Sequence, residues 1–306
     1  PTVLYLAPTK ALAADQLRRL APASHLVRAA TVDGDNSREE RAWARDHATF
    51  VLTNPDTLHH VVLPAHDRWA RLLGGLTHVV IDECHHYRGV FGAHVAHILR
   101  RLRRLCAHHG SDPLFVLSSA TVAEPAVFAE RLTGLEMAAV VDDASPHAAR
   151  TIALWEPPVI AGARDGADPS GGSRGVDLDG IRRSATTEAA QLMTDLVIGR
   201  VRTLAFVRSR RGAESVAAAS QRLLGEIDPE LVRRVATYRG GYLPEERRAL
   251  EDRLRSGDLL GLASTNALEL GIDVAGLDAV ITVGFPGTRA ALQQQLHANA
   301  LIHLAS

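Results

Sequence analysis

Two adjacent carboxylates, Asp82 and Glu83, directly follow the apolar run Val79-Val80-Ile81 and precede Cys84-His85-His86. Such a β-branched run predicts a strand buried on both faces of a parallel sheet, and ligands bind at the carboxyl edge of such sheets. There, one carboxylate could hold Mg²⁺ through water while its neighbour orients or deprotonates the water that attacks a nucleotide γ-phosphate. The same residues could equally form a helix N-cap with first-turn acids after a core strand.

The length and composition indicate a two-domain protein. The chain has 306 residues, of which 46% are hydrophobic, which is enough for two cores. Its two cysteines, Cys84 and Cys106, indicate a reducing compartment and exclude a disulfide scaffold or a four-cysteine zinc module within these residues. The N-terminus begins in a strand-like run without a basic region or a cleavage site. We therefore expect a cytoplasmic protein that does not enter a membrane.

The charges alone do not identify a nucleic-acid-binding protein, because the net charge is −1. Lys10 is the only lysine, and an excess of arginine with abundant alanine is typical of a GC-rich genome. The arginines of residues 100–104 have helical spacing and indicate a solvated helix face. The run at residues 208–211 follows an apolar strand-like segment and is a better candidate for phosphate contacts.

Strand-like and helix-like segments alternate along both halves of the chain, which predicts an α/β fold with parallel sheets covered on both faces by helices. In the first half we expect strands at 2–6, 50–52, around 79–81 and at 114–117, and helices at 10–20, 38–45 and 92–106. In the second half we expect strands at 203–207, 235–237, 260–264 and 279–283, and helices at 187–198, from 208 through 224 and at 244–255.

The composition changes between these halves. Residues 158–183 are rich in Gly, Ser and Asp, and residues 161–175 hold no large apolar side chain, which is typical of a linker or a long loop. We therefore expect a first domain at 1–157 and a second domain at 184–306.

Short polar segments follow the expected strands in a specific order. They are Ala7-Pro8-Thr9-Lys10, Thr53-Asn54-Pro55-Asp56, Asp82-Glu83-Cys84-His85, Ser119-Ala120-Thr121, Arg208-Ser209-Arg210, Ser264-Thr265-Asn266-Ala267 and Gly271-Ile272-Asp273. This ordered set resembles superfamily 2 helicases of the DEAD/DEAH-box type, here with a DECH box. The segments 87–92 and 240–248 are similar to those of the MrfA/YprA group of bacterial DNA-repair helicases and their eukaryotic RecQ-related relatives.

The resemblance implies two tandem RecA-like domains that couple ATP hydrolysis to movement along a nucleic-acid strand. It implies that Asp82 binds Mg²⁺, that Glu83 is the general base, that His85 contacts the second domain, and that Ser119 and Thr121 couple hydrolysis to strand movement. The polar residues 119–121 could also simply cap the following helix. Gly271 and Asp273 are implied at the nucleotide.

The partner implied by the resemblance is single-stranded DNA, held by its backbone, and a nucleoid-associated location follows from that partner. The implied strand-binding residues are Pro8, Thr9, Lys10, Thr53, Asp56, Arg208, Ser209, Arg210, Thr265 and Asn266.

Two departures from the helicase pattern concern the nucleotide phosphates. A phosphate loop needs glycines followed by Lys and Ser or Thr, but no glycine precedes Lys10. We therefore expect an internal start at Pro1, downstream of that loop. After Gln293-Gln294-Gln295 the helicases continue into Gly-Arg-Ala-Gly-Arg, whereas residues 296–303 hold no arginine. Since arginine fingers contribute about 10³–10⁵ in rate, this chain is expected to hydrolyse ATP poorly by itself.

The sequence leaves three functions open. The first is an ATP-dependent DNA helicase core of 3′ to 5′ polarity that acts in repair, with ATP and Mg²⁺ as cofactors. The second is an ATP-independent single-strand-binding fragment or pseudoenzyme. The third is a metal hydrolase built on Cys84-His85-His86, for which no further ligands at suitable spacing are evident.

Overall fold

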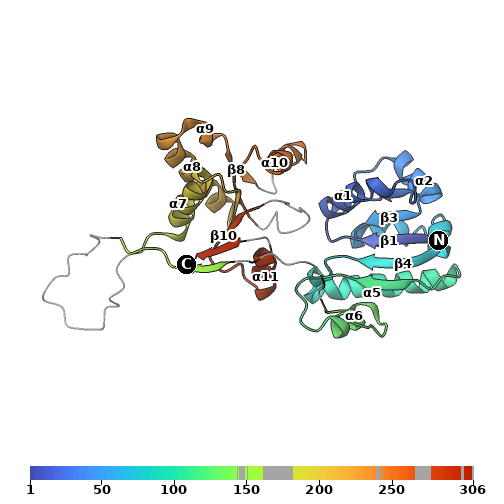
Figure 1. Cartoon of the computed structure of the whole chain (residues 1–306). Helices are drawn as coiled ribbons and strands as arrows, with labels where there is room; N and C mark the ends of the chain where they lie inside the picture. Colours follow the sequence, from blue (N-terminus) through green and yellow to red (C-terminus); the bar gives the residue numbers. More distant parts are fainter. Residues whose placement is uncertain are drawn as a thin grey trace, which may run out of the picture. The chain divides into compact units, whose positions relative to one another are not determined.

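The computed structural model divides into two units, one built from residues 1–145 and one that begins at residue 146 (Figure 1). It describes residues 1–142, 151–160, 182–238, 244–265, 277–297 and 300–304, together with residues 144, 149 and 242. None of the described helices is both long enough and apolar enough to cross a membrane.

The first unit contains a five-stranded parallel sheet in the order β2-β3-β1-β4-β5. Its strands are β1 (Thr2–Leu6), β2 (Ala29–Thr31), β3 (Phe50–Thr53), β4 (Leu76–Ile81) and β5 (Leu114–Leu117). Its α-helices are α1 (Lys10–Arg19), α2 (Arg38–His47), α3 (Pro55–Thr57), α4 (Ala70–Gly74), α5 (Gly89–His108) and α6 (Pro125–Thr133). Shorter helical turns are η1 (Ala21–Ala23), η2 (Leu58–Val62) and η3 (Cys84–His86).

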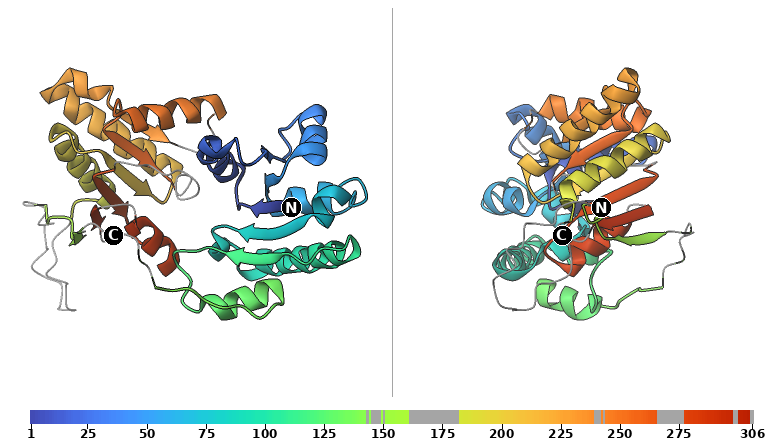
Figure 2. Two further views of the ribbon diagram at one scale, coloured as in Figure 1. Left: turned by 45° about the vertical axis from the view of Figure 1, so that its right-hand side comes forward. Right: turned by 90° about the vertical axis from the view of Figure 1, so that its left-hand side faces the viewer.

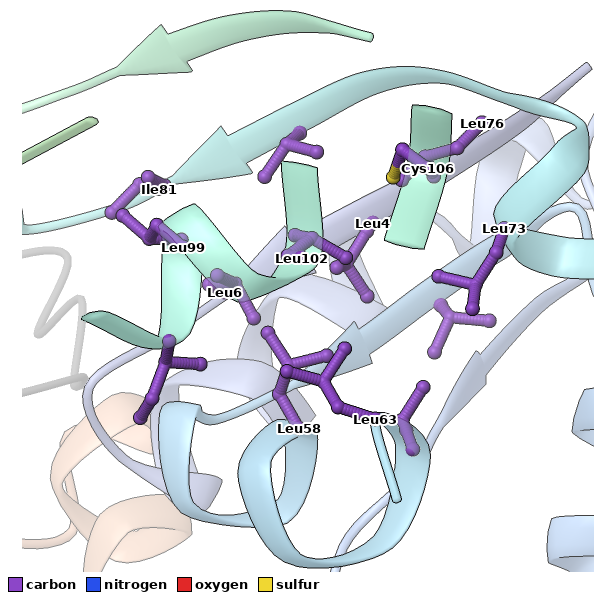
Figure 3. Close-up of a cluster of buried hydrophobic side chains, with 14 of the residues drawn as sticks. Leu4, Leu6, Leu58, Leu63, Leu73, Leu76, Ile81, Leu99, Leu102 and Cys106 are labelled. Atoms are coloured by element: carbon purple, nitrogen blue, oxygen red, sulfur yellow. The ribbon is translucent and has the colours of Figure 1, made fainter. Parts of the chain in front are cut away.

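Alternating side chains of these strands enter two apolar layers. Leu4, Leu6 and Ile81 belong to the larger core, which is completed by apolar side chains of α2, η2, α4 and α5. Leu52 faces the other layer, where it packs with Leu12 of α1. Figure 3 shows strand leucines of the larger core together with the helix leucines that cover them. The first sheet is thus covered on both faces, as the sequence predicts.

The second unit contains a six-stranded parallel sheet in the order β6-β11-β10-β7-β9-β8. Its strands are β6 (Ile152–Trp155), β7 (Thr203–Val207), β8 (Val235–Tyr238), β9 (Gly261–Ser264), β10 (Ala279–Val283) and β11 (Ala300–Leu304). Its helices are α7 (Ala185–Ile198), α8 (Arg210–Ile227), α9 (Pro229–Val232), α10 (Pro244–Ser256) and α11 (Arg289–His297). Helices α7 and α8 lie against one face of the second sheet (Figure 2). Their apolar side chains pack with those of β7, β9 and β10.

The expected strands and helices are present, and two tandem RecA-like domains are confirmed. The structure adds β2, α4, β6, α9, α11 and β11, which were not expected. Strand β6 lies within the segment 1–157 that we assigned to the first domain, but it pairs with β11 of the second sheet. Most of the expected linker, at 161–181, lies outside the described residues.

Candidate nucleotide and nucleic-acid site

The polar segments of the first unit meet at the carboxyl edge of the first sheet. Leu6, the last residue of β1, is in register with Thr53 of β3 and with Ile81 of β4. Ile81 is in register with Leu117 of β5. The segments at 7–10, 53–56, 82–85 and 118–121 therefore begin side by side, because parallel strands in register end at the same edge.

Asp82 is fixed at this edge by three hydrogen-bond donors. Its Oδ2 accepts from the Tyr5 hydroxyl, and its Oδ1 accepts from the Ser118 hydroxyl at 2.5 Å and from the Glu83 amide at 2.9 Å. Its own amide donates to the Leu6 carbonyl at 2.9 Å. Burial and the hydrogen bond to Asp82 raise the pKa of Tyr5 well above its usual range, so Tyr5 remains a protonated donor at neutral pH.

These oxygens fit a magnesium ion that is held mainly through water. An ionised carboxylate offers about four lone-pair sites, and three donors occupy sites on Asp82. Mg²⁺ usually keeps several waters and binds one or two carboxylates together with substrate phosphates. Asp82, with Glu83 next to it, would supply carboxylate oxygen and a rigid acceptor for the ion's waters.

Glu83 occupies a strained turn. Its backbone has φ 48° and ψ 43°, a left-handed conformation that costs a non-glycine residue on the order of 1–3 kcal/mol. The turn is held by the Cys84 amide, which donates to the Ser118 carbonyl at 2.9 Å. The Glu83 side chain is 31% exposed. The carboxylate is thus positioned at the edge of the sheet and open to solvent, as a general base toward water must be.

His85 links the DECH segment to the segment after β5. The ring is buried, and its Nδ1 lies 3.0 Å from the Ser119 hydroxyl and 3.2 Å from the Glu83 carboxylate. The Ser119 hydroxyl in turn accepts from the Thr121 amide at 3.3 Å. Three of the residues named as catalytic or coupling are therefore joined in one hydrogen-bonded group.

Several buried polar atoms beside this group have no hydrogen-bond partner among the described residues. They are His86 Nε2, the Tyr87 hydroxyl and the Thr121 hydroxyl. Burial and the neighbouring His85 lower the pKa of His86 to about 4, so this ring is neutral at pH 7. Buried unsatisfied polar atoms are uncommon, and their concentration here indicates a place for water or a ligand.

Thr9 and Ser209 occupy equivalent positions in the two units. Thr9 follows β1 and caps α1, accepting from the Leu12 amide at 3.2 Å, and Ser209 follows β7 and caps α8, accepting from the Gly212 amide at 3.0 Å. Each cap is followed by a cation at the first helical position, Lys10 or Arg210. A capped helix N-terminus with an adjacent cation is suited to a phosphate.

The remaining strand-binding candidates differ in accessibility. Arg208, Arg210 and Asp56 are exposed and Pro8 is half-buried, while Lys10 pairs with Asp35 at 2.8 Å on the surface. Thr53, by contrast, is only 2% exposed, and its hydroxyl donates to the Val32 carbonyl at 2.6 Å. A contact between this hydroxyl and a strand does not fit that arrangement, so Thr53 acts as a structural residue in this state.

Thr265 follows β9, whose Ser264 is in register with Phe206 of β7, so it begins at the same edge of the second sheet as Arg208. Asn266, Gly271 and Asp273 lie outside the described residues.

Substitutions at Ser209 separate its capping role from a phosphate contact. Ser209→Ala is expected to destabilise the second unit by about 1 kcal/mol, because the α8 cap is lost. Ser209→Asp retains a capping oxygen but opposes a phosphate with negative charge. We therefore expect urea unfolding to show that Ser209→Asp is stable. Fluorescence titration should show that it binds single-stranded DNA weakly. Wild-type binding by Ser209→Asp would contradict a phosphate contact at this position.

Comparisons with known protein families identify both units of the chain as helicase domains. Residues 1–128 match the family described as DEAD/DEAH box helicase, and residues 188–297 match the helicase conserved C-terminal domain. Together the two matches cover more than half of the chain.

The chain belongs to the DEAD/DEAH-box helicases of superfamily 2, which are ATP-dependent enzymes. Within this family it is similar to the MrfA/YprA group. It is 42% identical over 297 residues to the Bacillus subtilis uncharacterized ATP-dependent helicase YprA, covering 95% of this chain and 37% of YprA. It is 38% identical to the Saccharomyces cerevisiae ATP-dependent helicase HRQ1, covering 96% of this chain and 27% of that protein. The chain thus spans about a third of these relatives or less.

Two solved helicase structures are similar to this chain. The helicase MrfA, crystallised with DNA and AMPPNP, matches with a TM-score of 0.89 and 39% identity over 100% of this chain and 42% of its own. The Mycobacterium smegmatis helicase Lhr, bound to single-stranded DNA and AMP-PNP, matches with a TM-score of 0.73 and 26% identity, over 99% of this chain and 40% of its own.

The sequence analysis missed two functional candidates, Tyr5 and Ser118, which both donate to Asp82. The only local signal for Tyr5 is a hydroxyl between two leucines of a strand-like run. The hypothesis of a metal site at Cys84-His85-His86 gains no support, since these three residues are not part of a metal-ligand cluster among the residues that the structure describes. Burial and the adjacent Glu83 also raise the pKa of the Cys84 thiol to about 11, which disfavours the thiolate that binds metal.

Proposed function

We propose that residues 1–306 form the two-domain motor core of an ATP-dependent DNA helicase that moves along single-stranded DNA in the 3′ to 5′ direction and acts in DNA repair. The observation that carries the proposal is the fixed Asp82 carboxylate beside the His85–Ser119 link at the carboxyl edge of the first sheet. The relatives crystallised with DNA and an ATP analogue support the substrate and the cofactor.

In this proposal each residue of the edge has one task. Asp82, held by Tyr5 and Ser118, would hold Mg²⁺ through water, and the ion would supply positive charge that neutralises the phosphates. Glu83 orients the attacking water and accepts its proton. The hydrogen bond between His85 and Ser119 connects this carboxylate pair to the segment ending at Thr121, which transmits the change in the site to the bound strand.

The strand itself is held at the backbone by the capped helix N-termini. Thr9 with Lys10 on α1 and Ser209 with Arg210 on α8 form these contacts, assisted by Arg208 and by Thr265. Hydroxyls, amides and cations of this kind contact phosphates without reading the bases, so we expect binding that is indifferent to sequence and weakens with salt.

The 306-residue chain by itself is proposed to hydrolyse ATP poorly. It contains neither a glycine-rich loop that ends in Lys and Ser or Thr nor a Gly-Arg-Ala-Gly-Arg segment. Among the described residues of the first unit, those assigned to the nucleotide are Asp82, Glu83 and His85, and they leave the β-phosphate without a backbone cradle.

The test compares the chain with its Glu83→Gln variant in ATP hydrolysis, with and without single-stranded DNA, and measures DNA affinity at two salt concentrations. We expect strand binding that falls with salt and hydrolysis that equals the variant's background. DNA-stimulated turnover that disappears in Glu83→Gln would contradict the proposed impairment. Absence of salt-sensitive strand binding would contradict the nucleic-acid contacts. An affinity for single-stranded DNA that is the same with and without ATP would favour the second candidate, an ATP-independent strand-binding protein.

A further inference from the structure

Four potential metal ligands converge on the first unit away from the helicase site. They are His66, Asp67, His108 and His109, each of which offers one ligand atom, and these atoms all lie within 4.8 Å of one another. His66 Nδ1 lies 3.1 Å from His109 Nε2 and 3.3 Å from Asp67 Oδ1. Around a four-coordinate zinc ion with bonds of about 2.0–2.2 Å, neighbouring ligand atoms lie roughly 3.3 Å apart. These two separations already match that geometry.

The rings are arranged so that their nitrogens converge while their faces do not stack. The His66 ring is nearly perpendicular to the His108 ring, at 88°, with centroids 5.7 Å apart. The rings of His108 and His109 meet at 76° with centroids 4.9 Å apart. Three imidazoles and one carboxylate form a donor set that suits a divalent transition metal, and zinc in particular.

The backbone on the helix side is rigid. Helix α5 ends at His108, and Gly110 takes φ +85°, which favours glycine. The Ser111 amide donates to the Cys106 carbonyl at 2.9 Å, and the Gly110 amide donates to the Ala107 carbonyl at 3.1 Å. This closed helix end holds His108 and His109 in place.

The turn that carries His66 is equally fixed. The Arg68 amide donates to the Ala65 carbonyl at 2.9 Å, the Trp69 amide donates to the His66 carbonyl at 3.0 Å, and the Trp69 side chain is buried in the core. Helix α4, which follows this turn, is joined to the segment after α5, because the Ser111 hydroxyl donates to the Leu73 carbonyl at 2.5 Å. Figure 3 shows Leu73, Leu76 and Cys106 at one end of this core.

The cluster lies at the edge of the sheet opposite the helicase site. Its residues precede α4 and β4 on one side and β5 on the other, so they lie near the amino ends of these strands. The carboxyl terminus of α5 also favours positive charge there, because its last carbonyls point outward. Binding at this place needs neither Asp82 nor Glu83.

We propose that His66, Asp67, His108 and His109 bind one zinc ion that ties the turn before α4 to the end of α5. The ion would close the chain between residues that lie 43 positions apart, and it would replace the His66–His109 hydrogen bond. Its role is structural, since it fixes the amino edge of the sheet on which the helicase residues are built.

The experiment uses the chain without a histidine tag, freed of metal with a chelator, and titrates zinc against a chromophoric competitor. We expect one zinc per chain. His66→Ala and His109→Ala should each weaken binding more than about 100-fold, because even residues that only orient metal ligands contribute about 10–100-fold. His97→Ala, an exposed histidine on the same helix, is the matched control and should bind as the wild type does.

Two further readouts keep the result independent of folding defects. Cobalt should give the intense visible spectrum of a tetrahedral site in the wild type and His97→Ala, and not in His108→Ala, whose ring is exposed. Zinc should raise the thermal unfolding midpoint of the same two proteins only. Substoichiometric zinc, or equal affinity in the His66→Ala, His109→Ala and His97→Ala variants, would overturn the proposal.

Discussion

Replacing Glu83 with glutamine is expected to reduce ATP hydrolysis by about 10²–10⁴-fold in a longer protein that joins this chain to a phosphate loop, since that is the usual contribution of a positioned general base. The amide keeps the shape of the side chain but cannot accept a proton. The left-handed turn at Glu83 and its 31% exposure place this carboxylate where it can reach water. DNA-stimulated phosphate release measures the effect.

The matched variant is Glu39→Gln, the same chemical change at an exposed acid in the first turn of α2. It should leave hydrolysis unchanged. DNA binding in the presence of an ATP analogue should be retained in both variants, because Glu83 is proposed to act on water and not on the strand. Hydrolysis that survives in Glu83→Gln would assign the base to another residue.

Replacing Gly92 with alanine is expected to destabilise the first unit by about 1–3 kcal/mol, the usual cost of overpacking. A Cβ at this position would lie 2.3 Å from the Tyr87 carbonyl oxygen and 2.5 Å from its carbon, so the backbone itself must move. Tyr87 lies two residues after the DECH segment, and its ring is buried in the core. The variant should therefore have a lower free energy of unfolding, measured with urea. The movement of Tyr87 should also disturb the hydrogen bond between His85 and Ser119.

Gly225→Ala is the matched control, since Gly225 also lies inside a helix. There the nearest atom to an added Cβ is 3.6 Å away on Val232, which is an ordinary contact. Because glycine in a helix interior is less favourable than alanine by roughly 0.5–1 kcal/mol, this variant should be as stable as the wild type or slightly more so. Equal stability of Gly92→Ala and Gly225→Ala would show that the start of α5 can relax.

Local features of the sequence predicted most elements of the fold. The run at 79–81 gave the position of β4, and the capping box at Ser37 and Glu40 correctly placed the start of α2. These predictions succeeded because periodicity, capping and strand propensity act between near neighbours in the chain. Strand β11, at residues 300–304, is also mostly apolar, but it was missed because a short apolar run does not distinguish a strand from a buried helix segment.

The amino-acid sequence by itself determined most of the strands and helices, the family, and the carboxyl-edge position of Asp82, Glu83 and His85. Only the tertiary structure decided which side chains meet. It joined Tyr5 to Asp82 across 77 residues and buried Thr53 against Val32. It also brought His66 beside His109, whereas the sequence had drawn attention to Cys84-His85-His86. The reason is physical: strand register and helix packing bring distant residues together, and no local pattern encodes those distances.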